Sequence, residues 1–124
     1  MLKGRNNNCN IEMRSFDIIV WGATGFTGQL VAKYLSGKKG FKWAIAGRNR
    51  EKLDELVKSS LETINPPSVL VASVDQPASI QAMVSSTRVL LSTAGPFASV
   101  GTIIVENCVT EGTDYCDITG EIAW

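Results

Sequence analysis

Hydrophobic and polar positions follow two alternating patterns along this chain. Short runs rich in apolar residues lie at 18–21, 41–46, 69–74, 89–93 and 114–118, and the first shows no polar alternation. Such runs are typical of strands in a parallel sheet, where both faces are covered. The segments between them carry apolar residues at helical spacing. This alternation predicts strand followed by helix four times, and then a closing strand.

Right-handed crossovers between successive strands determine how such a series folds. They predict an α/β fold with a Rossmann-type, doubly wound parallel sheet of five strands in the order 3-2-1-4-5. The polar segment 1–14 is expected to be a flexible leader, and residues 15–124 to form one domain. Ligands of such sheets bind beyond the carboxyl ends of the strands, here at the switch point between the first and fourth.

Most of the predicted helices have an inward face and a signal at one end. Asn49 is an expected N-cap, Pro77 suits a first helical position, and Gly37 suits a C-cap. The apolar residues predicted to face the sheet are Phe26, Leu30, Val31, Tyr34 and Leu35 in the first helix, Leu53, Leu56 and Val57 in the second, and Ile80, Met83 and Val84 in the third.

The segment 101–111 fits two structures. Its β-branched run at 102–105 favours a strand by propensity. A helix is favoured by the length of the span between a candidate cap, Ser99, and Gly112, and by apolar residues at helical spacing. We predict a helix whose inward residues are Ile104, Val105, Cys108 and Val109.

Three glycines at every third position join the first strand to the first helix: Gly22, Gly25 and Gly28. In a dinucleotide site they allow a tight turn, the approach of a pyrophosphate to the backbone, and close packing of helix on strand. The helix that begins here offers unpaired N–H groups and the positive end of its dipole. A structural turn can use glycines too, but the position between a buried strand and a helix favours an NAD(P)-binding domain over 15–124.

The end of the second predicted strand bears on the choice of nucleotide. An NAD site requires Asp or Glu about twenty residues beyond the glycines, whereas Arg48 stands there in this chain. A guanidinium can pair with a 2′-phosphate, so NADP is predicted rather than NAD; the alternative is an arginine that solvates the start of a helix. Asp75, after the third strand, either contacts the adenine or stabilises a helix N-terminus.

Composition argues against several other functions. The 124 residues have zero formal net charge, which gives no bulk attraction to nucleic acid, so no nucleic-acid partner is expected. The chain has no histidine, and its three cysteines show no CxxC spacing, so no metal site is expected either. Three cysteines without a secretory signal suggest reduced thiols and a cytoplasmic location. No apolar run reaches the length of a membrane helix.

Four motifs occur in order: Gly-Ala-Thr-Gly-Phe-Thr-Gly at 22–28, Ala-Gly-Arg at 46–48, Thr-Ala-Gly-Pro-Phe at 93–97, and Asp-Tyr-Cys-Asp-Ile-Thr-Gly-Glu at 114–121. Together they resemble the amino-terminal part of the saccharopine dehydrogenase-like oxidoreductases, which include the mycobacterial trans-acting enoyl reductases. The resemblance implies an NADP-dependent oxidoreductase. It places Gly22, Thr24, Gly25, Phe26 and Thr27 at the pyrophosphate, Arg48 at the 2′-phosphate, and Ala94, Gly95 and Pro96 beside the nicotinamide-side ribose.

The resemblance also implies a larger protein. Members of the family are several times longer, and their second domain, which shapes the substrate pocket, is expected to be absent from this chain. Turnover by these residues alone should therefore be negligible. The family's links to lipid metabolism and lipid droplets suggest a lipid-related substrate and allow association with a membrane surface. Asp117, Thr119 and Glu121 either orient a substrate or form a turn that caps the next helix.

Two other functions stay open. One is a non-catalytic NADP-binding sensor or regulatory module, a class that shares Gly-Ala-Thr-Gly-x-x-Gly; the other is a truncated product without independent activity. The run at 115–121 favours the oxidoreductase. The last strand, with Tyr115, Cys116 and Ile118, would present an apolar sheet edge, which predicts self-association.

Overall fold

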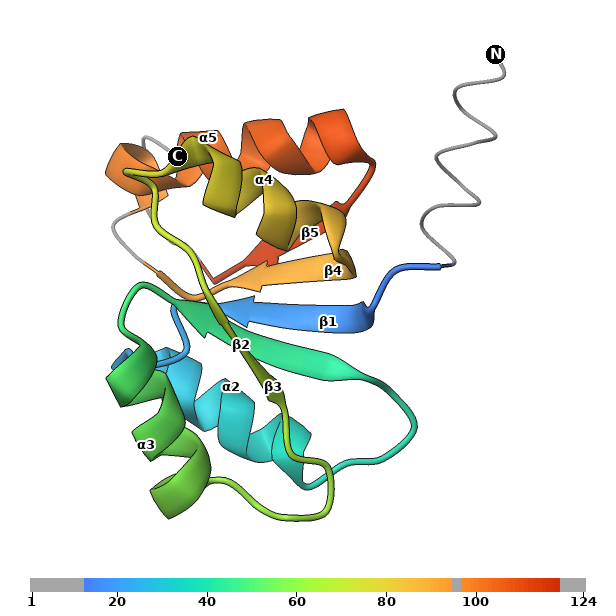
Figure 1. Ribbon diagram of the computed structural model, residues 1–124, viewed down its shortest axis with the longest axis vertical. Coiled ribbons are helices and arrows are strands. Elements are labelled where there is room, and N and C mark those ends of the chain that lie inside the picture. Colours follow the sequence, from blue (N-terminus) through green and yellow to red (C-terminus); the bar gives the residue numbers. More distant parts are fainter. Residues whose placement is uncertain (1–12, 95–96, 119–124) are drawn as a thin grey trace.

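The computed structural model describes residues 13–94 and 97–118, which form a sheet between two layers of helices (Figure 1). The strands are β1 (Phe16–Trp21), β2 (Trp43–Gly47), β3 (Ser68–Val71), β4 (Thr87–Ser92) and β5 (Asp114–Asp117). The helices are α2 (Phe26–Ser36), α3 (Arg50–Ser60), α4 (Pro77–Ser85) and α5 (Phe97–Glu111). The predicted alternation is confirmed, including the helix at 101–111.

The five strands are parallel and lie in the order β3-β2-β1-β4-β5, as predicted. In the central strand, Val20 lies between Ile45 of β2 and Leu91 of β4. Helices α2 and α3 cover one face of the sheet, and α4 and α5 cover the other (Figure 1). The order in which strands are added to the sheet therefore reverses between β1 and β4. The carboxyl ends of these two strands border the crevice in which such folds bind ligands.

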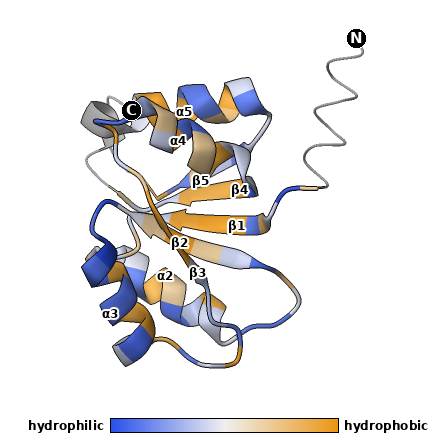
Figure 2. Ribbon diagram, in the orientation of Figure 1, coloured by the Kyte–Doolittle hydropathy of each residue, from blue (hydrophilic) through white to orange (hydrophobic). Residues whose placement is uncertain are grey.

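Each face of the sheet has its own core. Ile19 and Leu90 pack with α4 and α5, and Val20 and Ile45 pack with α2 and α3. Figure 2 shows β1 and β4 among the most hydrophobic parts of the molecule, as a sheet covered on both faces requires. Within the part of the chain that the structure describes, no helix is long and apolar enough to cross a membrane.

Helix α2 packs through a different face from the one predicted. Three of the residues expected to be inward, Phe26, Leu30 and Tyr34, are exposed, and the fully buried positions are Gly28, Ala32 and Ser36. Small residues spaced four apart let the helix axis approach the sheet closely. Val31 and Leu35, at the sides of this small-residue face, pack against the core as predicted.

The other helices agree better with the sequence. Asn49 caps α3, its Oδ1 accepting a hydrogen bond from the Lys52 N–H at 3.1 Å, and the inward residues of α3 and α4 are as predicted. Ile104 and Cys108 of α5 are buried, but Val109 was wrongly placed inward and is exposed.

Several strands begin or end away from the predicted positions. The largest difference is in β3, which ends at Val71 rather than at residue 74. Beyond it, Ser73 no longer follows the ladder: its N–H donates to Ser79 Oγ at 3.0 Å, and its carbonyl accepts from the same hydroxyl at 3.2 Å. These bonds tie the end of the strand to the start of α4.

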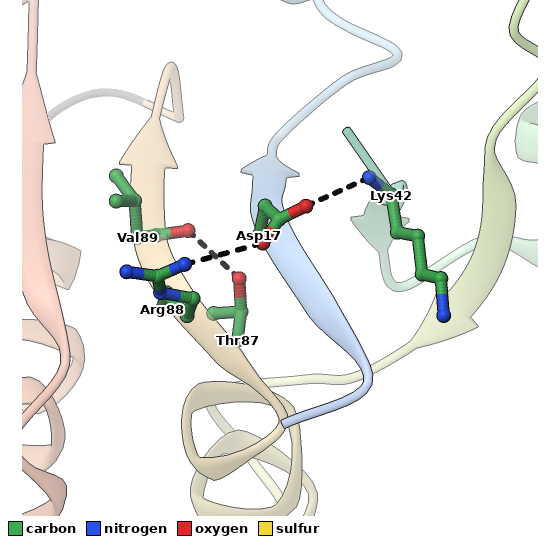
Figure 3. A network of polar contacts seen from close by, with 5 residues as sticks. All are labelled: Asp17, Lys42, Thr87, Arg88 and Val89. Carbon is green, nitrogen blue, oxygen red and sulfur yellow. Dashed lines mark hydrogen bonds and ion pairs between the residues drawn. The ribbon is translucent and has the colours of Figure 1, made fainter. Parts of the chain in front are cut away.

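The amino ends of β1 and β4 are joined by side chains (Figure 3). Asp17 accepts a hydrogen bond from the Lys42 backbone N–H at 2.9 Å, and its other carboxylate oxygen lies 3.7 Å from Arg88 Nη1. Thr87 Oγ1 donates to the carbonyl of Val89 at 3.0 Å. These contacts lie at the end of the sheet opposite the crevice and stabilise the strands.

Arg14, which the sequence analysis assigned to the leader, is held against the domain. Its Nη1 donates to the carbonyl of Thr87 at 2.7 Å and to Thr113 Oγ1 at 2.5 Å, and its Nη2 donates to the carbonyl of Glu111. Glu111 is the last residue of α5, where a cation is favourable to the helix dipole. Arg14 therefore joins the segment before β1 to β4 and to the end of α5, at the end of the sheet opposite the crevice.

Candidate cofactor site

The three glycines of the turn have three different surroundings. Gly22 has a φ of +82°, which favours glycine, and a Cβ there would lie 2.8 Å from Ala94 Cβ. A Cβ on Gly28 would lie 2.3 Å from the Gly22 carbonyl oxygen and 2.7 Å from Ala23 Cα. Gly25 has an ordinary φ of −73°, and its nearest contact would be 3.5 Å away. Gly22 and Gly28 are thus required by the fold, whereas a Cβ on Gly25 would make only an ordinary van der Waals contact.

Hydrogen bonds hold the turn in one shape. The Gly22 N–H donates to the carbonyl of Ala46 in β2 at 3.0 Å, and the Gly25 N–H closes the turn onto the Gly22 carbonyl at 3.1 Å. From α2, Gln29 Nε2 donates to the Thr24 carbonyl at 2.8 Å. The backbone that would meet a phosphate is therefore preorganised.

Thr93, directly after β4, connects the two loops of the crevice. Its N–H donates to the Trp21 carbonyl at 2.9 Å, and its hydroxyl lies 2.8 Å from the same oxygen and 3.0 Å from the Gly22 carbonyl. Its hydroxyl has one proton, which these two carbonyls share. The sequence analysis gave Thr93 no role of its own, although its place at the end of a central strand could have indicated one.

The N-terminus of α2 suits an anion. Gly25 is its N-cap and provides no side-chain cap, and the first turn contains no acidic residue. The first backbone bond within the helix runs from Gln29 N–H to the Gly25 carbonyl at 2.9 Å. The N–H groups of Phe26, Thr27 and Gly28 precede it and point out of the helix end, where they carry its positive partial charge.

A cleft of about 210 Å³ lies at the carboxyl ends of the strands. Four of the predicted site residues line it together: Gly22, Thr24, Arg48 and Ala94. Four lining residues were missed, although the rule that ligands lie at strand ends could have found them. These are Trp21, Gly47, Ser73 and Val74.

The remaining predicted residues lie in several places. Gly25, Phe26, Thr27 and Gly28 form the turn and the first turn of α2 beside the cleft. Asp75 is exposed and does not line the cleft, so its contact with adenine stays a prediction. Gly95 and Pro96 lie outside the residues that the structure describes.

A larger hollow, about 580 Å³, lies on the other side of Thr24, between α2 and α3. Most of its lining comes from α3, including the exposed residues Glu51, Lys52 and Glu55. The smaller cleft is the better candidate for a dinucleotide because it adjoins the helix N-terminus and lies at the switch point of the sheet.

Arg48 is exposed at the mouth of the cleft, directly after β2. The two ion pairs seen among residues 13–94 and 97–118 join Arg50 to Asp54 and Arg88 to Asp17, and neither involves Arg48. No carboxylate lines this cleft. The position can therefore accept a 2′-phosphate without repulsion.

A polar cluster lies farther along the sheet, at the carboxyl ends of β4 and β5. Tyr115 Oη donates a hydrogen bond to Asp117 Oδ2 at 2.7 Å. Burial, and then the hydrogen bond and charge of Asp117, raise the pKa of Tyr115, whereas a hydrogen bond with Ser92 lowers it. Tyr115 is therefore a neutral donor at physiological pH. Thr119 and Glu121, which were grouped with Asp117, lie outside the described residues, as does Cys9.

The described parts of the chain contain no group of three histidine, cysteine, aspartate or glutamate residues that could hold a metal ion.

Comparison with known families identifies the kind of domain. Residues 18–122 match the saccharopine dehydrogenase NADP binding domain. The chain belongs to this family. The cofactor of this family is NADP, as the sequence predicted. The uncapped start of α2 and the exposed Arg48 are compatible with this cofactor, and the contacts of Arg48 with it stay a prediction.

Named relatives cover almost the whole NADP-binding domain. It is 37% identical over 112 residues to a trans-acting enoyl reductase of Mycobacterium leprae, covering 90% of this chain and 27% of that protein. It is 32% identical over 123 residues to a saccharopine dehydrogenase-like oxidoreductase of Mus musculus, covering 89% of this chain and 29% of that protein. The chain thus spans between a quarter and a third of the length of these relatives.

Solved structures support the fold. A saccharopine dehydrogenase (L-Glu forming) from Saccharomyces cerevisiae superposes with a TM-score of 0.71 at 16% identity, covering 88% of this chain and 23% of that one. At this identity the likeness concerns the Rossmann-like fold alone.

Proposed function

We propose that this domain binds NADP(H) in the cleft at the ends of β1, β2 and β4 and serves an oxidoreductase with a lipid-related substrate. The observation that carries the proposal is the convergence of Gly22, Thr24, Arg48 and Ala94 on one cleft beside an uncapped helix N-terminus. The names of the relatives, an enoyl reductase and an oxidoreductase, support the reaction class. They give no support to a non-catalytic sensor.

Each part of the site has a physical task in this proposal. The N–H groups at the start of α2 bind the pyrophosphate, and the absence of a side chain at Gly25 lets it approach. Arg48 forms a charge-assisted pair with the 2′-phosphate. Gln29 and Thr93 hold the loops around it. The bound cofactor would supply a hydride, and residues of β4 and the loop at Ala94 would border its nicotinamide half.

The cofactor preference tests this assignment. Arg48 should favour NADPH over NADH by about 1.5–3 kcal/mol, or about 10- to 150-fold in Kd. Fluorescence titration of the parent and of Arg48→Ala measures it, with Arg50→Ala as the control because Arg50 is paired with Asp54 at 3.7 Å. Equal affinities in the parent, or an unchanged preference in Arg48→Ala, would contradict the assignment.

Catalysis can be tested separately from binding. With an enoyl or carbonyl thioester present, the isolated chain should bind NADPH without oxidising it, because the cleft is open and does not exclude water. NADPH absorbance follows the reaction. Sustained turnover would mean that these residues contain a complete substrate site.

A further inference from the structure

The cofactor cleft and the larger hollow between α2 and α3 meet at one place. On one side they share Thr24, which lines both of them. On the other side the lining passes from one to the other between consecutive residues, because Arg48 lines the cleft and Asn49 lines the hollow. A group held between Thr24 and Arg48 at the mouth of the cleft is therefore also at the mouth of the hollow.

One face of α3 forms most of the wall of this hollow. Its residues follow one another at helical spacing: Asn49, Lys52, Leu56 and Ser59. The other wall comes from Thr24 and from Gln29 in the first turn of α2. Both helices begin where their preceding strands end, so the start of α3 lies across the hollow from the start of α2 (Figure 1). Asn49 and Lys52 are therefore at the end of the hollow nearest Thr24.

Lys52 is in a position to reach the mouth of the cleft. It is the third residue of α3, its side chain is exposed, and its N–H donates to Asn49 Oδ1 at 3.1 Å. Side chains of an α-helix lean towards its N-terminus and cover the preceding turn. The long Lys52 side chain can therefore extend past Asn49 towards Arg48.

The charge of Lys52 is not used by the fold. Within 13–94 and 97–118 the two ion pairs join Arg50 to Asp54 and Arg88 to Asp17, so Lys52 has no carboxylate partner there. Two acidic residues of the same hollow, Glu51 and Glu55, are four apart and form a separate row on α3. They repel an anion from the depth of the hollow, which favours a phosphate at its mouth, beside Thr24.

We propose that Lys52 is a second determinant of the preference for NADP(H), and that its ammonium group binds the 2′-phosphate together with Arg48. The inference rests on the proposed function, since it adds a residue to the same cofactor site. A guanidinium binds a phosphate as a planar fork, whereas an ammonium group is a strongly hydrated point charge on a flexible stem. Lys52 should therefore contribute less to the preference than Arg48 does.

Titration of the chain and of Lys52→Gln with NADPH and NADH tests the proposal. Affinity for NADPH should fall about three- to tenfold, with no change for NADH, because one charge-assisted contact is lost. Lys58→Gln is the matched control, since Lys58 is exposed on the same helix and lines neither the cleft nor the hollow. It should bind both nucleotides as the parent does, and Lys52→Arg should keep the preference for NADPH.

Two fragments of the cofactor identify the phosphate that Lys52 binds. Adenosine 2′,5′-bisphosphate and adenosine 5′-monophosphate differ only in the 2′-phosphate. Lys52→Gln should weaken binding of the first by the same factor as NADPH and leave the second unchanged. Equal losses for both fragments would overturn the proposal, because Lys52 would then act on the 5′-phosphate. An unchanged preference in Lys52→Gln, or an equal loss in Lys58→Gln, would overturn it too.

Arg48→Ala separates this inference from the proposed function. If the parent prefers NADPH, and Arg48→Ala loses this preference while Lys52→Gln keeps it, the cofactor site is right and the role of Lys52 is wrong. If the parent binds NADPH no better than NADH, the assignment of the 2′-phosphate site fails, and the inference fails with it.

Discussion

Two glycines of the turn allow a paired test. The same substitution should lower the stability of the domain at Gly28 and weaken NADPH binding at Gly25. Gly28→Ala places a methyl group 2.3 Å from the Gly22 carbonyl oxygen, 2.7 Å from Ala23 Cα and 2.8 Å from Thr93 Oγ1. Two of these three atoms are backbone, so the helix must move away from the sheet. Overpacking of this kind costs about 1–3 kcal/mol, and the crowding of the backbone places Gly28→Ala at the upper end.

The better helix propensity of alanine returns up to about 1 kcal/mol. We therefore expect Gly28→Ala to lower the free energy of unfolding by about 2 kcal/mol, on the order of 10 °C in Tm for a domain of this size. Gly25→Ala should change Tm little, because its Cβ would lie 3.5 Å from the nearest atom at a φ that any residue adopts. It should instead weaken NADPH binding by about 1.5–3 kcal/mol, because the methyl group displaces the phosphate from its N–H donors.

Thermal unfolding by circular dichroism and an NADPH titration on both variants measure these effects. A Gly28→Ala protein as stable as the parent would refute the close packing of α2 on β1. A Gly25→Ala protein that binds NADPH normally would refute the location of the phosphate.

Two further predictions concern stability. Arg14→Met should cost about 1.5–3 kcal/mol in urea unfolding, because its charged hydrogen bonds hold β4, α5 and Thr113 together. Arg88→Met is the control and should cost less than about 1 kcal/mol, since its pair with Asp17 is 3.7 Å long and half exposed. Equal losses would contradict the role of Arg14. Burial raises the pKa of the Cys108 thiol from 9.0 to about 12, so the unfolded chain releases this proton first and stability should fall as pH rises from 9 towards 12, by up to about 1.4 kcal/mol per pH unit. Urea unfolding at pH values on both sides of 9 measures this loss. The free energy of unfolding should fall less in Cys108→Ala than in the parent, and an equal fall in both proteins would exclude Cys108 as its cause.

The strand order and the location of the cleft could be predicted because several sequence signals agree on them. The apolar run that became β1, the glycines after it and Arg48 after β2 all indicate the same edge of a parallel sheet. The missed residues Ser73 and Val74 lie where β3 was expected to continue. Their departure from the strand depends on hydrogen bonds to Ser79, which is in a different element.

The packing face of α2 could not be predicted from hydrophobicity. Both of its faces repeat every four residues: Phe26, Leu30 and Tyr34 on one side, Gly28, Ala32 and Ser36 on the other. Hydrophobic periodicity selects the first, but the tight turn at Gly22 brings α2 so near the sheet that only small side chains fit between them. The geometry of the turn thus decided what the pattern of apolar residues could not.

The central position of β1 has a consequence for the synthesis of this protein on the ribosome. One edge of β1 pairs with β2, which follows soon after it, whereas the other edge pairs with β4, and Thr87 comes 71 positions after its partner Phe16. At roughly 5–20 residues per second, this second edge stays without its partner for about 4–14 seconds after it is made. During that time the nascent chain exposes the edge of an apolar strand, open to pairing with another chain. Until translation reaches residue 92, this edge of β1 therefore has no strand of its own chain to pair with along its full length.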